Sequence, residues 1–365
     1  MKLSVAMCTY NGARYLQEQL ASLAAQTRLP DELVVCDDCS SDGTVVILEE
    51  FKAQAPFPVR LYLNEQNLRV LRNFAKAISL CEGDVIALCD QDDVWLPEKL
   101  SRFEAEFARA PEVGLVFSDL EVVGEELQPL GFTSWQSGWV QFGQEEQQLF
   151  KQGKALAVLL TRNVITGAGA AFRREFVDLV LPFPEVSKTF LHDYWLGLMI
   201  ATVARLSPIP EPLVKYRVHA DQQASLLLPR EHSSVRQEAK GKRAHYPFEW
   251  ETLRRVAERL AEQQPAYREV LSDLQQHLEH GRVRVSLPEY RFHQRLRRAV
   301  GELAAGRYHR YQRPNAHPCH DFFNDVMPYS VVEFMESVGI GPDKSTHPPL
   351  ATTRARRASP PIKEE

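Results

Sequence analysis

Short runs of β-forming residues alternate with helical patterns over the first 120 residues, and this alternation restricts the fold more than any other feature of the chain. The strand-like runs cover residues 3–8, 33–36, 59–63 and 85–89, and the helical patterns cover 14–26, 44–54 and 70–80. Such alternation is typical of a parallel sheet whose faces are covered by helices. We therefore predict an α/β fold with a mostly parallel sheet and flanking helices.

Polar residues follow each predicted strand. The clusters are Thr9-Tyr10-Asn11-Gly12, Asp37-Asp38, residues 64–67 and Asp90-Gln91-Asp92-Asp93. In open α/β sheets, ligands bind outside the carboxyl ends of the strands. The clusters therefore predict one ligand-binding edge.

Length and charge narrow the protein class. A chain of 365 residues suggests two or three domains, and 44% hydrophobic residues exclude a fibrous or wholly disordered protein. The 43 basic and 48 acidic residues give a net charge of -5, so we expect no nucleic-acid partner. No run approaches the ~18 apolar residues of a membrane span, and no signal-peptide core follows Met1, which predicts a cytoplasmic protein.

The cysteines are expected to be reduced, because five of the six lie in or beside apolar strand-like runs. Cys36 and Cys39 form a CxxC pair, but both residues between them are acidic and no second pair follows. His317, Cys319 and His320 lie close together, yet their spacing fits no four-ligand framework. Neither group favours a metal site.

The strongest chemical signal is the run ALCDQDDVW at residues 87–95, which places Asp90, Asp92 and Asp93 within four positions after an apolar strand. Three carboxylates this close repel one another, and hard divalent cations are their usual partners. The alternative is a solvated loop in which Asp93 caps the helix that begins near Pro97.

Asp37 and Asp38 end the second predicted strand. Acidic residues often cap the helix after such a turn, so their position leaves two readings open. A carboxylate there can also accept a hydrogen bond from a pyrimidine imino group or a ribose hydroxyl. Asp37 is therefore a candidate nucleotide ligand.

An ordered series of motifs resembles family 2 glycosyltransferases, especially bacterial rhamnosyltransferase-like members. The motifs are CTYNG (8–12), VVCDDCSSDGT (34–44), NFAKAI (73–78), ALCDQDDVW (87–95), TGAGAAFRRE (166–175), HDYW (192–195) and LVKYRVH (213–219). The resemblance covers roughly residues 1–225, and the succession is far more specific than the DxD motif alone.

This resemblance implies a GT-A fold, which is Rossmann-like, and an inverting glycosyltransferase. The enzyme would use a divalent cation, Mn²⁺ or Mg²⁺, and a nucleoside-diphosphate sugar as donor. Rhamnose is the sugar we favour, and the acceptor would be a hydroxyl of a cell-envelope glycan or a lipid-linked saccharide. Such a protein could also lie peripherally on the inner face of the cell membrane.

The resemblance also implies roles for single residues. Nucleotide-sugar contacts would come from Thr9, Tyr10, Asn11, Asp37, Asp38, Arg72, Asp90 and Gln91. Asp92 would bind the metal, His219 would add a metal or diphosphate contact, and Asp193 would be the general base. Further candidates are Asp93, Trp95, His192 and Arg69.

Two features leave alternatives open. His192 and His219 could be hydrogen-bonded structural histidines, and for His192 we favour that reading. Relatives usually carry a glycine after the third-loop asparagine, whereas this chain continues from Asn67 to Leu68 and Arg69. A side chain there disfavours the usual backbone conformation of the loop, and Arg69 or Arg72 could instead reach the diphosphate.

The sequence also predicts how the chain is divided into domains. The catalytic domain comprises a nucleotide-sugar-binding half (1–120) and an acceptor half (121–225), followed by a charged linker (226–247), a helical extension (248–340) and a disordered tail (341–365). Within the acceptor half we expect an irregular insertion over the site at 125–154, a strand at 166–172, a helix at 192–203 and a strand at 212–218.

Residues 282–313 carry nine arginines against Glu289 and Glu302, with aromatic residues between them. This composition suits an anionic membrane surface, and it equally suits a solvated helix face or an intersubunit contact.

Other functions fit less well. A sugar-1-phosphate nucleotidyltransferase has a related fold but needs a basic, glycine-rich loop after the first strand, where this chain reads CTYNGARY. A phosphatase with a nucleophilic DxD motif carries it after the first strand, whereas here it follows the fourth. A non-catalytic nucleotide-sugar-binding protein on the same fold remains an alternative.

Overall fold

The computed structural model describes residues 1–137, 140–160, 162–184, 192–220, 222, 254–262, 268–287, 291–310, 322 and 326. The predicted linker at 226–247, the tail at 341–365 and the group His317, Cys319 and His320 lie outside these residues. The proposed domain boundaries at 225 and 340 remain predictions.

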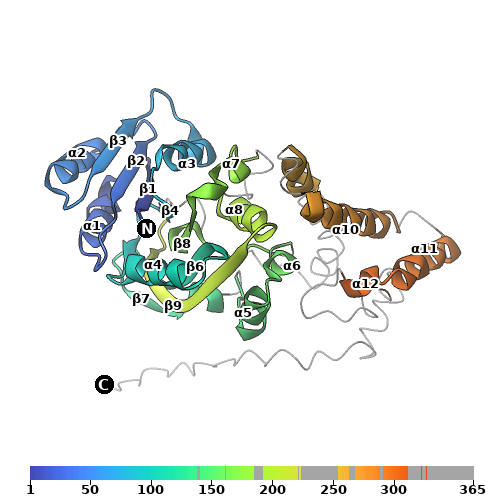
Figure 1. The fold of residues 1–365 in the computed structure, drawn as a ribbon. Coiled ribbons are helices and arrows are strands. Elements are labelled where there is room, and N and C mark those ends of the chain that lie inside the picture. Colours follow the sequence, from blue (N-terminus) through green and yellow to red (C-terminus); the bar gives the residue numbers. More distant parts are fainter. Residues whose placement is uncertain are drawn as a thin grey trace, which may run out of the picture.

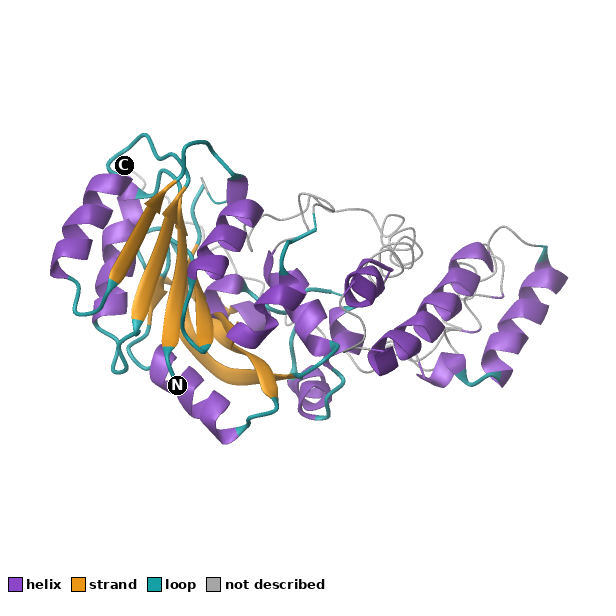
Figure 2. Ribbon diagram, turned by 45° about the horizontal axis from the view of Figure 1, so that its top comes forward, coloured by secondary structure: helices purple, strands orange, loops and turns teal. Residues whose placement is uncertain are grey.

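A nine-stranded sheet forms the centre of the molecule (Figure 2). Its first half is parallel in the order β3-β2-β1-β4, built from β1 (Leu3–Thr9), β2 (Glu32–Asp37), β3 (Val59–Leu63) and β4 (Val85–Cys89). These elements match the predicted strands to within one residue at each end, because each is a short apolar run bounded by polar residues.

The second half of the sheet mixes parallel and antiparallel neighbours. It continues from β4 through β8 (Ala170–Arg173), β6 (Val113–Val123), β9 (Arg205–Arg217) and β5 (Val94–Trp95), while β7 (Pro129–Thr133) pairs with β6. Strands β6 and β9 run parallel, whereas β8 is antiparallel to both of its neighbours. The sheet is therefore parallel mainly where the nucleotide-sugar-binding half was expected.

Helices cover both faces of the sheet (Figure 1). Apolar side chains of α1 (Ala13–Ala24), α2 (Thr44–Gln54) and α4 (Lys99–Arg109) pack on one face, and those of α3 (Arg69–Leu80) and α8 (His192–Ala201) on the other. Neighbouring residues of β1 show the alternation, since Val5 contributes to the first core and Ala6 to the second.

The expectation of an irregular insertion over the site at 125–154 is wrong. This stretch contains β7, a short 3₁₀ turn and α5 (Gln144–Lys151), and it is followed by α6 (Ala155–Leu159). Its aromatic residues Trp135, Phe142 and Phe150 surround Phe117 of β6, with ring centroids 5.5–5.7 Å from that ring. Burial of these rings holds the segment in the core, although their spacing has no helical or strand period.

The remaining predicted elements are present with altered bounds. The strand expected at 166–172 is a 3₁₀ turn, Gly167–Gly169, followed by β8, and the strand expected at 212–218 is part of the longer β9. The 3₁₀ turn Arg174–Phe176 and the short helix α7 (Val177–Val180) follow β8.

Helices also form the described part of the predicted extension. They are residues 254–262, α10 (Arg268–Ser286), α11 (Phe292–Ala304) and α12 (Arg307–Arg310). Val256, Leu260 and Leu271 are buried in the core that includes α8, and Glu302 of α11 accepts hydrogen bonds from His280 and Arg307 at 2.7 Å each. Within the described ranges, no helix has the length and apolarity needed to cross a membrane.

Candidate active site

Polar residues at the carboxyl ends of β1, β2 and β4 meet at one edge of the sheet. The register pairs Thr9 with Asp37 and Met7 with Cys89, so the segments that follow these strands lie side by side. The structure thus brings together the three strand-end clusters that the sequence singles out.

Asp37 is buried and held by hydroxyl and amide donors. Thr9 Oγ1 and Ser40 Oγ donate to its Oδ1 at 2.8 and 2.6 Å, and the Ser40 amide donates to its Oδ2 at 2.9 Å. These contacts fix the orientation of the carboxylate at the end of β2.

Asp38 is turned toward the start of α3. The amides of Leu68 and Arg69 donate to its two oxygens at 2.7 and 2.9 Å, and Asn64 Nδ2 donates at 2.8 Å. These hydrogen bonds give Asp38 a structural role in the third loop, and the nucleotide contact that the resemblance implies for it stays a prediction.

Arg69 has a φ of 64°, in the left-handed region that favours glycine. The loop therefore keeps a left-handed residue despite the missing glycine, and the two amides held by Asp38 stabilise it. Arg69 and Arg72 lie exposed at the start of α3.

Gln91 clamps the backbone of Tyr10. Its Oε1 accepts from the Tyr10 amide at 2.8 Å and its Nε2 donates to the Tyr10 carbonyl at 3.1 Å. A Cβ at Gly12 would lie 2.2 Å from Gln91 Oε1, so this contact requires the glycine. Tyr10 itself is exposed, and Asn11 Oδ1 accepts from the Ser41 amide at 2.8 Å.

The carboxylates after β4 lie in a strongly acidic environment. Burial, together with the charges of the nearby Asp92 and Asp193, raises the pKa of Asp90 to about 7. Asp92 Oδ2 lies 2.9 Å from Nε2 of His219, beyond the end of β9. This pair supplies one oxygen and one nitrogen donor at the strand edge.

Asp93 does not cap a helix, so that alternative is wrong. Helix α4 begins at Lys99 after Glu98, without a capping side chain, whereas Asp93 is fully buried and accepts from the Arg217 amide at 3.0 Å. Its Oδ2 has no hydrogen-bond partner, and burial together with Asp92 raises its pKa.

Arg217 was not among the predicted site residues. Its Nε donates to the Asp92 carbonyl at 2.8 Å, its guanidinium lies 4.7 Å from the centre of the Tyr15 ring, and it also pairs with Glu18. The ring of His219 lies 4.7 Å from the same tyrosine. The two-residue spacing of Arg217 and His219 was the available signal, because such residues share one strand face.

Asp193 lies in the first turn of α8 and is buried. It accepts from the amides of Gly167 and Tyr194 at 3.0 and 2.6 Å, and from Asn163 Nδ2 at 3.2 Å. Burial raises its pKa to about 6 against the lowering effect of these bonds. A carboxylate with such a pKa can accept a proton near neutral pH.

His192 and Trp95 are core residues here. His192 stacks on Phe74 with ring centroids 4.0 Å apart, and burial lowers its pKa to about 3. Neither of its ring nitrogens has a hydrogen-bond partner, so His192 is a buried structural histidine without the expected bond. The Trp95 ring is buried beneath the ammonium of Lys99, 3.2 Å from its centre.

Metal ligands are few in the described residues. No three side chains of His, Cys, Asp or Glu there are grouped tightly enough to hold an ion by themselves. Cys36 and Cys39 are free thiols; Cys36 is buried, which raises its pKa to about 11. Asp92 and His219 could supply two ligands, with the remainder from water or a bound phosphate group.

Comparisons with known proteins agree with the motifs. The model of the Glycosyl transferase family 2 matches residues 4–180. An uncharacterized protein of Mycobacterium bovis is 30% identical over 231 residues, 60% of this chain and 59% of that protein. An uncharacterized glycosyltransferase of Nostoc sp. is 28% identical over 222 residues, 60% of this chain and 65% of that protein. The chain thus spans less than two thirds of these curated relatives.

Among solved structures, the chain is similar to the S. aureus protein TarS 1-349 in complex with UDP. The TM-score is 0.50 with 18% identity, over 93% of this chain and 92% of that chain. This likeness is one of fold. The likeness agrees with the predicted GT-A fold, and the family model agrees with the resemblance of the motifs over residues 4–180.

Asp38→Asn tests the structural role of that residue. The asparagine side chain has one acceptor oxygen and one NH₂ group, so the backbone N–H of either Leu68 or Arg69 would face this NH₂ donor. We therefore expect a loss of about 1–3 kcal/mol in the free energy of unfolding. Urea denaturation measures it. The control is Glu65→Gln on the exposed part of the same loop, and equal stability of the two variants would show that Asp38 does not hold α3.

Proposed function

Residues 4–180 belong to glycosyl transferase family 2, and from this premise we propose that the protein is a metal-dependent inverting glycosyltransferase. Its donor is a nucleoside-diphosphate sugar and its acceptor is a hydroxyl group. The observation that carries the proposal is the meeting of Asp90, Asp92 and Asp193 at one strand edge, where both neighbours raise the pKa of Asp90. Such a site joins a place for a cation to a candidate base.

The donor nucleotide would lie across β1 and β2. Asp37 is fixed by Thr9 and Ser40 at the position where a carboxylate can accept from a base or ribose, and the exposed Tyr10 ring offers a stacking surface. The fold neighbour TarS was solved with UDP, so a pyrimidine nucleotide is the first donor to test. We propose rhamnose as the sugar, on the HDYW and LVKYRVH motifs.

A divalent cation fits the residues beyond β4 and β9. Asp92 and His219 supply oxygen and nitrogen donors 2.9 Å apart, and the repulsion among Asp90, Asp92 and Asp93 favours a positive charge nearby. Mn²⁺ or Mg²⁺ accepts these ligands and stabilises charge on a leaving diphosphate as a Lewis acid. Gln91 and Arg217 hold the segment that carries Asp92.

Asp193 would accept the proton of the acceptor hydroxyl. The acceptor oxygen forms a bond to the anomeric carbon, the bond from that carbon to the diphosphate oxygen breaks, and the nucleoside diphosphate leaves. One base and one displacement invert the configuration at the anomeric carbon. Asn163 and the Gly167 amide orient the carboxylate for this transfer.

Donor and metal are tested together by thermal shift with UDP, dTDP, GDP and ADP, each with and without Mn²⁺. We expect one pyrimidine diphosphate to raise the melting temperature only with the metal, because Asp92 and His219 need diphosphate oxygens to complete the coordination. Asp92→Asn should abolish the metal-dependent part. No response to any nucleotide would contradict the proposal, and a response without turnover of any nucleotide sugar would favour a binding protein.

Asp193→Asn should keep donor binding and lose transfer by ~10²–10⁴-fold, because the amide cannot take up the proton. In the parent protein the base is active when ionised, so the rate should fall about tenfold per unit as the pH drops below about 6. Release of nucleoside diphosphate measures both effects. An unchanged rate in the variant would remove Asp193 from the mechanism.

A lipid-linked acceptor would place the enzyme at a membrane, and α11 has a surface that suits one. Phe292, Leu296 and Val300 recur every fourth residue on one face and are 51, 36 and 46% exposed. Arg291, Arg297 and Arg298 are also exposed, whereas Glu302, which is the sole acid of this helix, is buried. This combination is typical of helices that lie in an anionic lipid interface.

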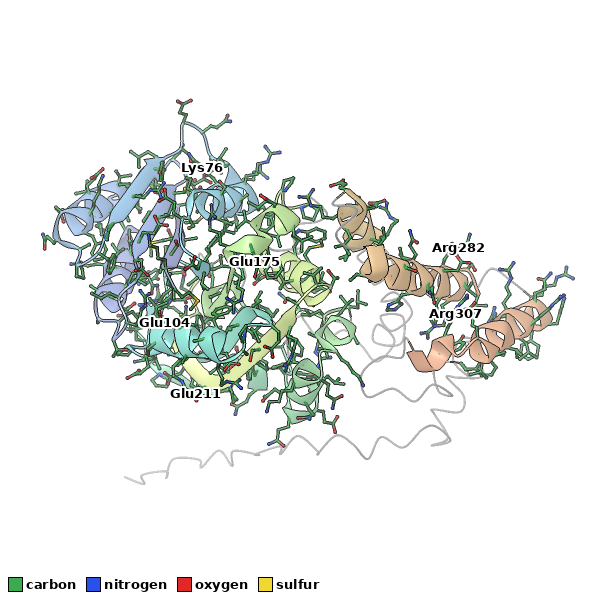
Figure 3. All side chains as sticks on the ribbon, viewed as in Figure 1. Lys76, Glu104, Glu175, Glu211, Arg282 and Arg307 are labelled. Atoms are coloured by element: carbon green, nitrogen blue, oxygen red, sulfur yellow. The ribbon has the colours of Figure 1, made fainter. Side chains whose placement is uncertain are left out.

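Only part of the arginine-rich segment takes part in this surface. Arg284 is buried over the Tyr308 ring, Arg307 pairs with Glu302, and Arg282 pairs with Glu279 on α10 (Figure 3). The first two contacts join α12 to α10 and to α11, whereas the Arg282–Glu279 pair lies within α10. The membrane proposal therefore rests on α11 rather than on all of residues 282–313.

Sedimentation with vesicles of phosphatidylglycerol and phosphatidylethanolamine tests α11. Leu296→Asp should lower the bound fraction about tenfold or more, because it replaces an exposed leucine of the apolar face of α11 by a charge. The matched control is Val46→Asp on α2, where Val46 is 61% exposed. Equal binding of the two variants would assign α11 to another partner or to solvent.

A further inference from the structure

Lys99, the first residue of α4, has no exposed surface. Its Nζ donates to the Ala168 carbonyl at 2.5 Å and lies 3.2 Å from the centre of the Trp95 ring. A buried lysine is costly unless its charge and its hydrogen-bonding groups are matched. A methionine or leucine would fill this position without that cost, so the amine requires an explanation.

The acceptor of this bond lies in the turn that holds the candidate base. Ala168 is the middle residue of the 3₁₀ turn Gly167–Gly169, and the Gly167 amide donates to Asp193 Oδ2 at 3.0 Å. The carbonyl that Lys99 binds and the amide that binds Asp193 belong to adjacent residues, Ala168 and Gly167. The turn thus joins α4 to the first turn of α8.

The turn is also confined by its neighbours. A Cβ at Gly167 would lie 2.9 Å from Nε2 of His192, and one at Gly169 would lie 3.0 Å from the Ser118 carbonyl. Contacts this close mean that a shift of the turn must move either β6 or the start of α8. Lys99 supplies the polar contact that fixes its middle residue.

The acidic groups that act on Lys99 lie at the end of β4 and in the segment that follows it. Burial lowers the pKa of Lys99, and Cys89, Asp93 and Asp90 oppose this effect, so that the pKa is about 7. Its amine donates to Ala168 and lies over Trp95, which follows Asp93 by two residues. Lys99 therefore contacts both the segment after β4 and the turn before β8.

We propose that Lys99 is a positioning residue for Asp193. Lys99 fixes the Gly167–Gly169 turn, which lies between the carboxylates after β4 and the base on α8. Lys99 does not touch the reacting atoms in this proposal. The kinetic consequence rests on the function proposed above, whereas the structural consequence does not.

The structural consequence is tested by amide hydrogen exchange in Lys99→Met. Methionine keeps the length of the side chain and its contact with Trp95 but donates no hydrogen bond. We expect the amides of residues 167–169 to exchange about tenfold faster or more, with unchanged exchange in β1. If methionine is not accommodated, Lys99→Leu removes the same donor. Unchanged protection of the turn in a folded variant would overturn the proposal.

The control for lost core packing is Phe103→Leu. Its ring centre lies 5.6 Å from Nζ of Lys99, and it shares the buried core with Ala168 but takes no part in the hydrogen bond to the Ala168 carbonyl. This variant should lose stability while the turn keeps its protection. Faster exchange in the turn of both variants would mean that α4 packing, rather than the Lys99 bond, controls it.

The kinetic consequence is tested by a double-mutant cycle of Lys99→Met and Asp193→Asn. Release of nucleoside diphosphate is followed with UDP-N-acetylglucosamine and dTDP-rhamnose, with water as the acceptor. Lys99→Met should lower kcat by ~10²-fold in the parent protein, since misplacement of a catalytic group by 1 Å has such effects. It should have little further effect beside Asp193→Asn, while the affinity for UDP stays unchanged in both.

Equal losses in both backgrounds would show that Lys99 does not act through Asp193. No release by the parent protein from either donor would count against the proposed function instead. The exchange measurement would then still decide whether Lys99 fixes the turn.

Discussion

Repulsion among carboxylates at the end of β4 is the constraint on which the site depends. Burial raises the pKa of both Asp90 and Asp93, and so does the negative charge of the nearby Asp92. Two basic residues lie close to these carboxylates. The guanidinium and the backbone amide of Arg217 bind the segment after β4, and the buried Lys99 lies near it. One oxygen of Asp93 still lacks a partner. The remaining demand for positive charge is the physical argument for a cation at this edge.

The carboxylates at the end of β2 show the opposite state. Asp37 and Asp38 accept several hydrogen bonds each from neighbouring loops, and these bonds fix the loops as much as the carboxylates. The acidic cluster after β2 and the acidic cluster after β4 therefore have different roles at one edge of the sheet. The carboxylates of Asp37 and Asp38 hold neighbouring loops in place, whereas the oxygen of Asp93 without a partner leaves a place where a charged group can bind.

The sequence predicted the first four strands and three helices closely, since their apolar periodicity is local. It missed β6 and the true course of residues 125–154, because packing of Trp135 and Phe142 against Phe117 depends on partners distant in the chain. The motifs single out Asp37, Asp92 and Asp193, whose roles stay predictions, whereas the sequence analysis did not single out Arg217 or Lys99. A single arginine or lysine beside apolar residues resembles a surface residue until its partners, up to 199 residues away, are known.

The pKa of Asp193 is a balance between burial, which raises it, and donors on three sides, which lower it. A general base needs a pKa near the working pH. Burial alone would keep the Asp193 carboxyl group protonated, whereas stronger hydrogen bonds would lower its pKa and make it too weak a base. Two of the donors, Gly167 and Asn163, lie in the segment before β8 rather than on α8. The pKa of Asp193, which we propose as the base, therefore depends on the place where that segment meets α8. Any contact that moves the turn changes both the position and the basicity of the carboxylate.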